Sequence, residues 1–166
     1  RDRGDTWKII SPDLTTNDKS KQMQSESGGL SMDNSGAENH TTIFTIAESP
    51  IDQNVIWVGT DDGNVQLTTD GGNSWRNLIS NINGVPKNTW VYHIEPSVHN
   101  LGTAYVVFDG HTTGDMNAYT YKTEDFGLTW ENIIPNNDVY GFARSIQEDY
   151  INPNLLFLGT EFGLYI

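Results

Sequence analysis

One short pattern occurs three times in this chain: Asp, any residue, Gly, any residue, Ser or Thr, and then Trp. The copies read DRGDTW from Asp2, DGGNSW from Asp70 and DFGLTW from Asp125, so three of the five tryptophans stand at the same position of one motif. Glycine tolerates positive φ, and a short polar side chain accepts hydrogen bonds from turn amides, which is typical of a tight turn. A turn that recurs in this way restricts the chain to an architecture built from repeats.

The repeat is about 50 residues long, since Trp75 and Trp130 are 55 positions apart (130 minus 75) and similar segments begin at Ile43, Val91 and Ala143. In the first copy the segments TIFTIAE, VIWVGT, NVQLTT and SWRNL are rich in β-branched and aromatic residues and are bounded by Pro, Gly, Asn or Asp. Four antiparallel strands joined by tight turns make one blade of a β-propeller. No segment has apolar residues at helical spacing over ten or more positions, so we predict an all-β chain.

The blades divide the chain unevenly, because both ends of the sequence fall inside a predicted blade. We expect a propeller fragment of two full blades plus a split third. The predicted divisions are 1–10, the last strand of a preceding blade; 11–40, a long polar loop; 41–79 and 90–134, two blades with the Asp turn; and 142–166, the first strands of a third blade.

The repeated motif is predicted to be a folding device at the turn between the third and fourth strands. The Asp carboxylate accepts hydrogen bonds from the turn, and the Trp opens the fourth strand and buries its ring against the blade. The residues with this structural role are Asp2, Gly4, Thr6, Trp7, Asp70, Gly72, Ser74, Trp75, Asp125, Gly127, Thr129 and Trp130.

These motif residues resemble the Asp-box, or BNR repeat, of sialidases, some other glycoside hydrolases and sortilin-type receptors. Three longer segments are most similar to sortilin-like propellers of large exported bacterial proteins. They are ENHTTIFTIAESPIDQNVIWVGTDDGNVQLTTDGGNSW, YKTEDFGLTW and NPNLLFLGTEFGLY. Such proteins are often labelled glycosyl hydrolases. The resemblance implies a β-propeller and an extracellular or periplasmic location of the parent protein, and it does not define a reaction.

Composition excludes several classes of function. A net charge of -13 repels phosphate backbones and anionic lipids, so we expect neither nucleic-acid nor membrane binding. The absence of cysteine rules out disulfides, thiolate catalysis and Cys-ligated zinc. No apolar run approaches the roughly 18 residues of a membrane span.

Loops on one face of the propeller are the longest, and any binding site is expected there. They are residues 11–41, 80–90, 108–118 and 135–141. The candidate residues on this face are His40, Asp61, Asp62, Trp90, Asp109, His111, Asp115 and Glu161.

Two chemical interpretations of these residues stay open. A carboxylate pair such as Asp61 with Glu161 would suit glycoside hydrolysis, whereas the alternative is that these acids belong to ordinary hairpin turns. His111 with Asp109 and Asp115 would suit a divalent cation, but no known metal-ligand spacing supports this, so we predict no metal site and no cofactor.

Sialidases, as the resemblance implies, hold their substrate with three arginines, and only Arg144 is expected on this face. Hydrolases of the xyloglucanase kind need two carboxylates and an aromatic cleft, for which Trp90 and Tyr92 are available. We prefer a non-catalytic module that binds a protein, peptide or glycan, with part of a xyloglucanase-like or sialidase-like glycoside hydrolase as the alternative.

The lone strand TWKII near the N-terminus and the split blade at the C-terminus leave two exposed sheet edges. We therefore hypothesise a head-to-tail, two-fold homodimer of six blades in which each copy completes the split blade of its partner. The alternative is an open fragment of a longer propeller that aggregates or stays partly frayed.

Overall fold

The computed structural model describes residues 4–22, 40–134 and 138–166, which form three antiparallel sheets. The first sheet consists of β1 (Ile43–Glu48), β2 (Ile56–Thr60), β3 (Val65–Thr68) and β4 (Arg76–Asn77). The second consists of β5 (Trp90–Pro96), β6 (Ala104–Asp109), β7 (Tyr119–Thr123) and β8 (Glu131–Asn132). The third consists of β9 (Ala143–Glu148), β10 (Leu156–Thr160) and β11 (Leu164–Tyr165). The described residues also contain the 3-10 turns η1 (Lys19–Lys21), η3 (Ile79–Asn81) and η4 (His111–Thr113).

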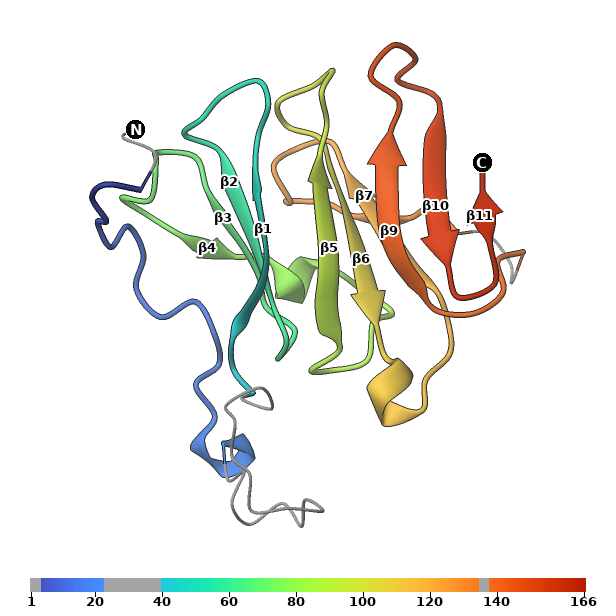
Figure 1. Ribbon diagram of the computed structural model, residues 1–166, viewed down its shortest axis with the longest axis horizontal. Coiled ribbons are helices and arrows are strands. Elements are labelled where there is room, and N and C mark those ends of the chain that lie inside the picture. The colour runs from blue at the N-terminus through green and yellow to red at the C-terminus, as the bar shows by residue number, and fades with distance from the viewer. Residues whose placement is uncertain (1–3, 23–39, 135–137) are drawn as a thin grey trace.

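The prediction of an all-β chain with four-stranded antiparallel sheets is confirmed. Strands follow one another in chain order within each sheet, as successive hairpins require. Figure 1 shows the three sheets side by side in chain order, with the first strands β1 and β5 facing each other and β9 next to them. The described residues contain no helix long and apolar enough to cross a bilayer.

The core lies between sheets rather than within one. Side chains of the first and second sheets form one buried cluster around Trp57, Leu67, Val106 and Phe108, and those of the second and third form another around Tyr105 and Ile146. Alternate residues of a strand face opposite sides, so β6 supplies Val106 to one cluster and Tyr105 to the other. The second sheet is therefore covered by a neighbour on both faces.

The predicted turn chemistry of the repeated motif is confirmed at Asp70. Its Oδ1 accepts hydrogen bonds from the Ser74 amide at 2.9 Å and the Thr68 hydroxyl at 2.7 Å, and its Oδ2 accepts from the Ser74 hydroxyl at 2.6 Å. Gly72 has a φ of 95°, a conformation that side chains disfavour. Together these contacts set the reversal between β3 and β4.

The turn at Asp125 repeats this arrangement with Thr123 and Thr129 in place of Thr68 and Ser74. The ring of Trp130, which follows this turn, packs edge-on against Trp57 with ring centroids 6.1 Å apart. Trp130 belongs to the second sheet and Trp57 to the first, so the motif tryptophan stabilises the contact with the preceding sheet.

The Asp70 turn provides a test by pH. Hydrogen bonds from the Ser74 hydroxyl and amide and the Thr68 hydroxyl lower the pKa of Asp70 from 3.8 to about 2. A carboxylate whose folded-state pKa is depressed contributes stability above its unfolded pKa, and this contribution is lost as the pH falls through the folded value. We expect Asp70→Asn to unfold at lower urea than the parent protein above about pH 4, and the difference to become steadily smaller as the pH falls from about 4 to about 2.

The measurement is urea unfolding of both proteins at several pH values, with Glu131→Gln as the control because Glu131 is an exposed acid of β8. A difference between Asp70→Asn and the parent protein that does not change between pH 5 and pH 2 would contradict the assigned hydrogen bonds.

The first copy of the motif behaves differently. Asp2 lies outside the described residues, Gly4 has a φ of 96°, and the Trp7 side chain is 91% exposed. The expectation that this tryptophan buries its ring is therefore wrong in this structure, where no described sheet covers Trp7. No strand is formed among residues 4–10, so the prediction that 1–10 supply the last strand of a preceding blade stays a prediction.

The described part of the long polar loop is attached to the first sheet. The carbonyl oxygen of Leu14 accepts hydrogen bonds from the side-chain amides of Asn64 at 3.0 Å and Gln66 at 2.8 Å. The Leu14 side chain is buried. Residues 23–39 of this loop lie outside the described residues.

Candidate functional site

The first strands of the three sheets share an irregularity at the same position. Each pairing with the second strand skips one residue, and the skipped residues are Phe44 in β1, Tyr92 in β5 and Arg144 in β9. A β-bulge turns the extra residue away from the regular pleat. Three neighbouring bulges therefore present two aromatic rings and one guanidinium group along the row of first strands.

Arg144 is held in place by groups from two sheets. Its Nε donates a hydrogen bond of 3.0 Å to Oδ2 of Asp109, whose side chain is fully buried at the end of β6. The guanidinium carbon lies 4.8 Å from the ring centre of Tyr92 and 4.8 Å from that of Phe142, within cation–π range of both rings. The Arg144 side chain is still 41% exposed, so part of it remains accessible to solvent.

His111 shares the Asp109 carboxylate. Its Nδ1 lies 2.8 Å from both carboxylate oxygens, and its ring stacks on Phe142 with centroids 4.8 Å apart. Nη2 of Arg144 lies 3.3 Å from the ring nitrogens of His111. One buried carboxylate thus orients two side chains that reach the surface.

An aromatic group continues from this point toward the first sheet. The ring of Phe44 lies 5.4 Å from that of Trp90 and 5.2 Å from that of Tyr92, measured between centroids. Phe44 is 42% exposed, although an exposed Phe is disfavoured in water. We call the following residues the aromatic–arginine site: Phe44, Trp90, Tyr92, Asp109, His111, Phe142 and Arg144.

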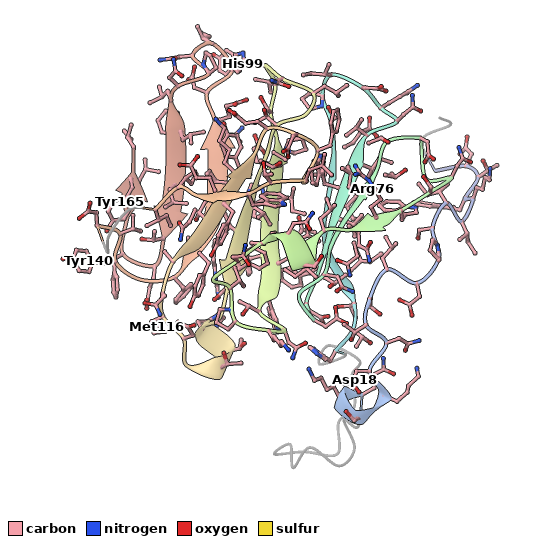
Figure 2. The ribbon with its side chains drawn as sticks, turned by 180° about the vertical axis from the view of Figure 1, so that it is seen from behind. Asp18, Arg76, His99, Met116, Tyr140 and Tyr165 are labelled. Carbon is pink, nitrogen blue, oxygen red and sulfur yellow. The ribbon has the colours of Figure 1, made fainter. Side chains whose placement is uncertain are left out.

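The site lies on the predicted face, where η4 and the loops between second and third strands are found. Figure 2 shows Met116, from the loop after β6, and Asp18 at one end of the molecule, and His99, from the turn between β5 and β6, at the opposite end. Trp90, Asp109 and His111 were predicted from the sequence, and the structure brings these three together.

The predicted catalytic pair is not brought together. Asp61, Asp109 and Glu161 hold equivalent positions at the end of the second strand of each sheet, so the second sheet separates Asp61 from Glu161. Asp61 is buried and accepts hydrogen bonds from the Thr42 amide at 2.7 Å and hydroxyl at 2.9 Å. Glu161 is exposed. These positions fit the turn interpretation of both acids, and no observation tests catalysis by them.

The remaining predicted residues have local partners. Asp62 is buried and accepts hydrogen bonds from the Thr16 amide and hydroxyl, both at 2.7 Å, which fastens the loop before β1 to the first sheet. His40 lies 3.8 Å from Asp61, outside the aromatic–arginine site. Asp115 accepts a hydrogen bond of 2.7 Å from the Tyr119 hydroxyl.

His93 lies one residue beyond Tyr92 on β5 and joins two sheets. Its Nδ1 accepts a hydrogen bond of 3.2 Å from the amide of Ile146 in β9. Burial lowers the pKa of His93, which favours the neutral imidazole that this acceptor role requires. His93 therefore supports the position of β9, and of Arg144 on it, beside β5.

No three His, Asp or Glu side chains among the described residues approach closely enough to hold a metal ion. The Asp109 carboxylate is already shared by Arg144 and His111.

Phe44 and Phe142 were missed as site residues, and Arg144 was considered only as a sialidase arginine. The repeat alignment contained a usable signal, because Phe44, Tyr92 and Arg144 occupy equivalent positions, as do Trp90 and Phe142. Aromatic side chains at equivalent positions of neighbouring first strands indicate a shared surface.

A comparison of the sequence with curated proteins finds one similar protein, and no family model matches the chain. The relative is an oligoxyloglucan-reducing end-specific xyloglucanase from Emericella nidulans, 26% identical over 100 residues, which are 57% of this chain. The match spans only 11% of the length of that relative.

Comparisons of structure find β-propeller proteins. An ancestral GH74 enzyme superposes with a TM-score of 0.57 at 20% identity, over 76% of this chain and 17% of that one. YCF48 bound to D1 peptide superposes with a TM-score of 0.54 at 18% identity, over 75% of this chain and 35% of that one. YCF48 from Cyanidioschyzon merolae superposes with a TM-score of 0.53 at 22% identity, over 74% of this chain and 33% of that one. At these identities the likeness shows the fold, and the three sheets are those of a β-propeller.

Proposed function

We propose that this chain is a non-catalytic binding module whose aromatic–arginine site binds a peptide segment that carries a carboxylate. The observation that supports this most is the position of Arg144, fixed between two aromatic rings by a buried carboxylate and still partly exposed to solvent. Its Nε is bound to Asp109 and its Nη2 lies 3.3 Å from the ring nitrogens of His111, so a ligand carboxylate would meet the remaining guanidinium N–H groups beside His111.

The aromatic members supply the second part of the recognition. Phe44, Trp90 and Tyr92 form a continuous aromatic surface next to the guanidinium group. Rigid aromatic side chains bury much area at little cost in conformational entropy, which is why they dominate binding energy at interfaces. A peptide with one apolar or aromatic residue near a carboxylate would meet both parts at once.

The overall charge of the protein restricts the kinds of peptide that it could bind. With a net charge of -13, the protein repels a strongly acidic chain before contact is made. A peptide with a single carboxylate, such as a free C-terminus, avoids most of this repulsion and still binds Arg144. The solved complex of YCF48 with D1 peptide supports a peptide as ligand for a propeller of this shape.

The glycoside hydrolase alternative has less support from the geometry. Hydrolysis needs two carboxylates, roughly 5 to 9.5 Å apart, that flank the scissile bond. Asp109, the carboxylate within the site, is fully buried and bound to Arg144 and His111. The similarity to a xyloglucanase is the observation that favours the hydrolase alternative. Incubation of the protein with xyloglucan oligosaccharides tests it, and we expect that no new reducing ends form.

Binding is tested on an array of 12-residue peptides of mixed sequence, synthesised once with a free C-terminal carboxylate and once amidated. We expect the free-carboxylate form of the best peptides to bind at least about tenfold more tightly, a difference of ~1.4 kcal/mol. Arg144→Lys should lose a similar factor, because lysine keeps the charge but lacks the planar group that stacks on Tyr92 and Phe142.

Arg76→Ala is the control, since Arg76 is an exposed arginine of β4, away from the aromatic–arginine site. Figure 2 shows Arg76 away from Met116 and the face that η4 occupies. Equal affinity for free and amidated peptides, or equal losses in Arg144→Lys and Arg76→Ala, would exclude Arg144 as the carboxylate-binding group.

An extracellular or periplasmic location and a head-to-tail homodimer remain proposals as well.

A further inference from the structure

An aspartate or asparagine is directly followed by glycine at four places in this chain: Asp62-Gly63, Asp70-Gly71, Asn83-Gly84 and Asp109-Gly110. At such a pair the main-chain nitrogen of the glycine attacks the side-chain carbonyl carbon of the preceding residue, because glycine has no side chain that blocks the approach. The attack requires a side chain that is free to turn toward this nitrogen. The tertiary structure therefore decides which of the four pairs reacts.

The three aspartates are held away from this reaction. Asp62 is buried and accepts two hydrogen bonds from Thr16, and both carboxylate oxygens of Asp70 accept hydrogen bonds within its turn. The amide nitrogens of the glycines that follow these two donate hydrogen bonds of 3.3 Å and 3.0 Å to main-chain carbonyl oxygens. The Asp109 side chain is fully buried and bound to Arg144. Each carboxylate must lose hydrogen bonds before it turns, which disfavours the attack.

Asn83 is in the opposite situation. It lies in the loop between η3 and β5, where both Asn83 and Gly84 are exposed. Among the described residues, neither the side-chain amide of Asn83 nor the main-chain nitrogen of Gly84 has a hydrogen-bond partner. Gly84 has a φ of 91°, so this turn favours glycine after the asparagine. Both reacting groups are therefore accessible to each other and to water.

Two asparagines shortly before Asn83 show the difference. Nδ2 of Asn77 donates a hydrogen bond of 2.9 Å to Oδ1 of Asn64, and Nδ2 of Asn81 donates one of 2.8 Å to the carbonyl oxygen of Gly127. Each is followed by a branched apolar residue instead of glycine. Asn77 and Asn81 are therefore matched internal controls for any reaction at Asn83.

We propose that Asn83 is a site of spontaneous deamidation in the folded protein, through a cyclic imide formed with the nitrogen of Gly84. This nitrogen loses its proton to hydroxide and bonds to Cγ of Asn83. The bond between Cγ and Nδ2 then breaks, and ammonia leaves after Nδ2 takes a proton from water. Water opens the imide at either of its two carbonyl carbons, which leaves aspartate or isoaspartate at position 83. The net change exchanges one ammonia for one water and needs no oxidant or reductant.

The products change the loop that leads into the aromatic–arginine site. Asn83, Gly84 and Lys87 line a cavity of about 360 Å³ beside the turn at Gly63, and the loop continues into Trp90. Both products place a new carboxylate at this cavity and make the net charge of -13 more negative by one. Isoaspartate also adds one carbon to the main chain before Trp90. The modification thus alters both the charge and the length of this loop.

The test is incubation of the folded protein at mildly alkaline pH, followed by brief digestion with trypsin and mass spectrometry. Trypsin cleaves after Arg76 and Lys87, so one peptide, NLISNINGVPK, contains Asn77, Asn81 and Asn83. We expect this peptide to gain the mass of an amide-to-acid exchange and to separate into two products, with fragment ions that place the change at position 83 alone. The reaction should proceed within about tenfold of its rate in the synthetic peptide of the same sequence, since an exposed loop rearranges at little cost.

Asn83→Ser is the control variant and should show no gain of mass in this peptide. The Asn83 side chain is exposed, so the replacement leaves the fold intact, which circular dichroism checks. Isomerisation of Asp62, Asp70 and Asp109 is followed in the same digests, and we expect it in urea-unfolded protein but not in folded protein. Two results would overturn the proposal: a reaction at Asn83 more than about tenfold slower in the folded protein than in the peptide, or isomerisation of the aspartates as fast as the change at Asn83 in the folded protein.

Discussion

Replacing Trp57 with alanine is expected to lower the free energy of unfolding by about 3–5 kcal/mol. Trp57 is fully buried in the cluster between the first and second sheets, and its ring contacts Trp130 edge-on. The substitution removes a large apolar surface and leaves a cavity lined by two sheets that β-strand pairing holds in place, so the site cannot collapse easily. Because domains of this size are stable by only about 5–15 kcal/mol, the variant loses a large part of its stability.

Urea unfolding followed by circular dichroism measures this loss without depending on tryptophan emission. Tyr150→Ala is the control, since Tyr150 is 77% exposed and its loss should change stability by less than about 0.5 kcal/mol. The loss of stability in Trp57→Phe should lie between the losses in Trp57→Ala and Tyr150→Ala. The indole N–H of Trp57 has no acceptor among the described residues, so phenylalanine removes an unpaired donor as well as volume. A loss below about 1 kcal/mol in Trp57→Ala would contradict the packing described here.

Replacing Glu148 with alanine is expected to cost about 3 kcal/mol or more, since a buried donor left without its acceptor costs about 1–3 kcal/mol and this carboxylate serves several. Glu148 lies at the end of β9 and is buried. Its Oε1 accepts a hydrogen bond of 2.9 Å from the Tyr105 hydroxyl, and its Oε2 accepts 2.7 Å and 2.9 Å bonds from the Ser97 hydroxyl and the Val98 amide. Tyr105 lies on β6, and Ser97 and Val98 lie in the turn between β5 and β6, so the substitution weakens the contact between the second and third sheets.

A double-mutant cycle with Tyr105→Phe measures this connection directly. Tyr105→Phe removes one of the donors, so the combined loss with Glu148→Ala should be smaller than the sum of the two single losses. Glu124→Ala is the matched control, because its side chain is 68% exposed and its ion pair with Lys122 lies at the surface. If Glu148→Ala unfolds at the same urea concentration as Glu124→Ala, the carboxylate does not join the two sheets.

Much of the fold was predictable because its signals are local. Asp70, Gly72 and Ser74 determine a turn through hydrogen bonds that span four residues. The β-branched and aromatic residues within TIFTIAE and VIWVGT determine two strands that pair with each other. The repeat then placed the loops that precede Trp90 and follow Asp109 on one face, where the aromatic–arginine site was found.

What the sequence by itself determined about this protein is therefore the sheet, its turns and the face of its long loops, since each depends on residues close together along the chain. Only the tertiary structure decided that Arg144 lies between Tyr92 and Phe142 on Asp109, because residues 35 to 52 positions apart meet only when separate sheets pack together. It also decided that Asp61 is buried and hydrogen-bonded whereas Trp7 is exposed. Burial depends on which neighbours cover a residue, and these neighbours come from other sheets and from the loop before β1, which are distant along the chain.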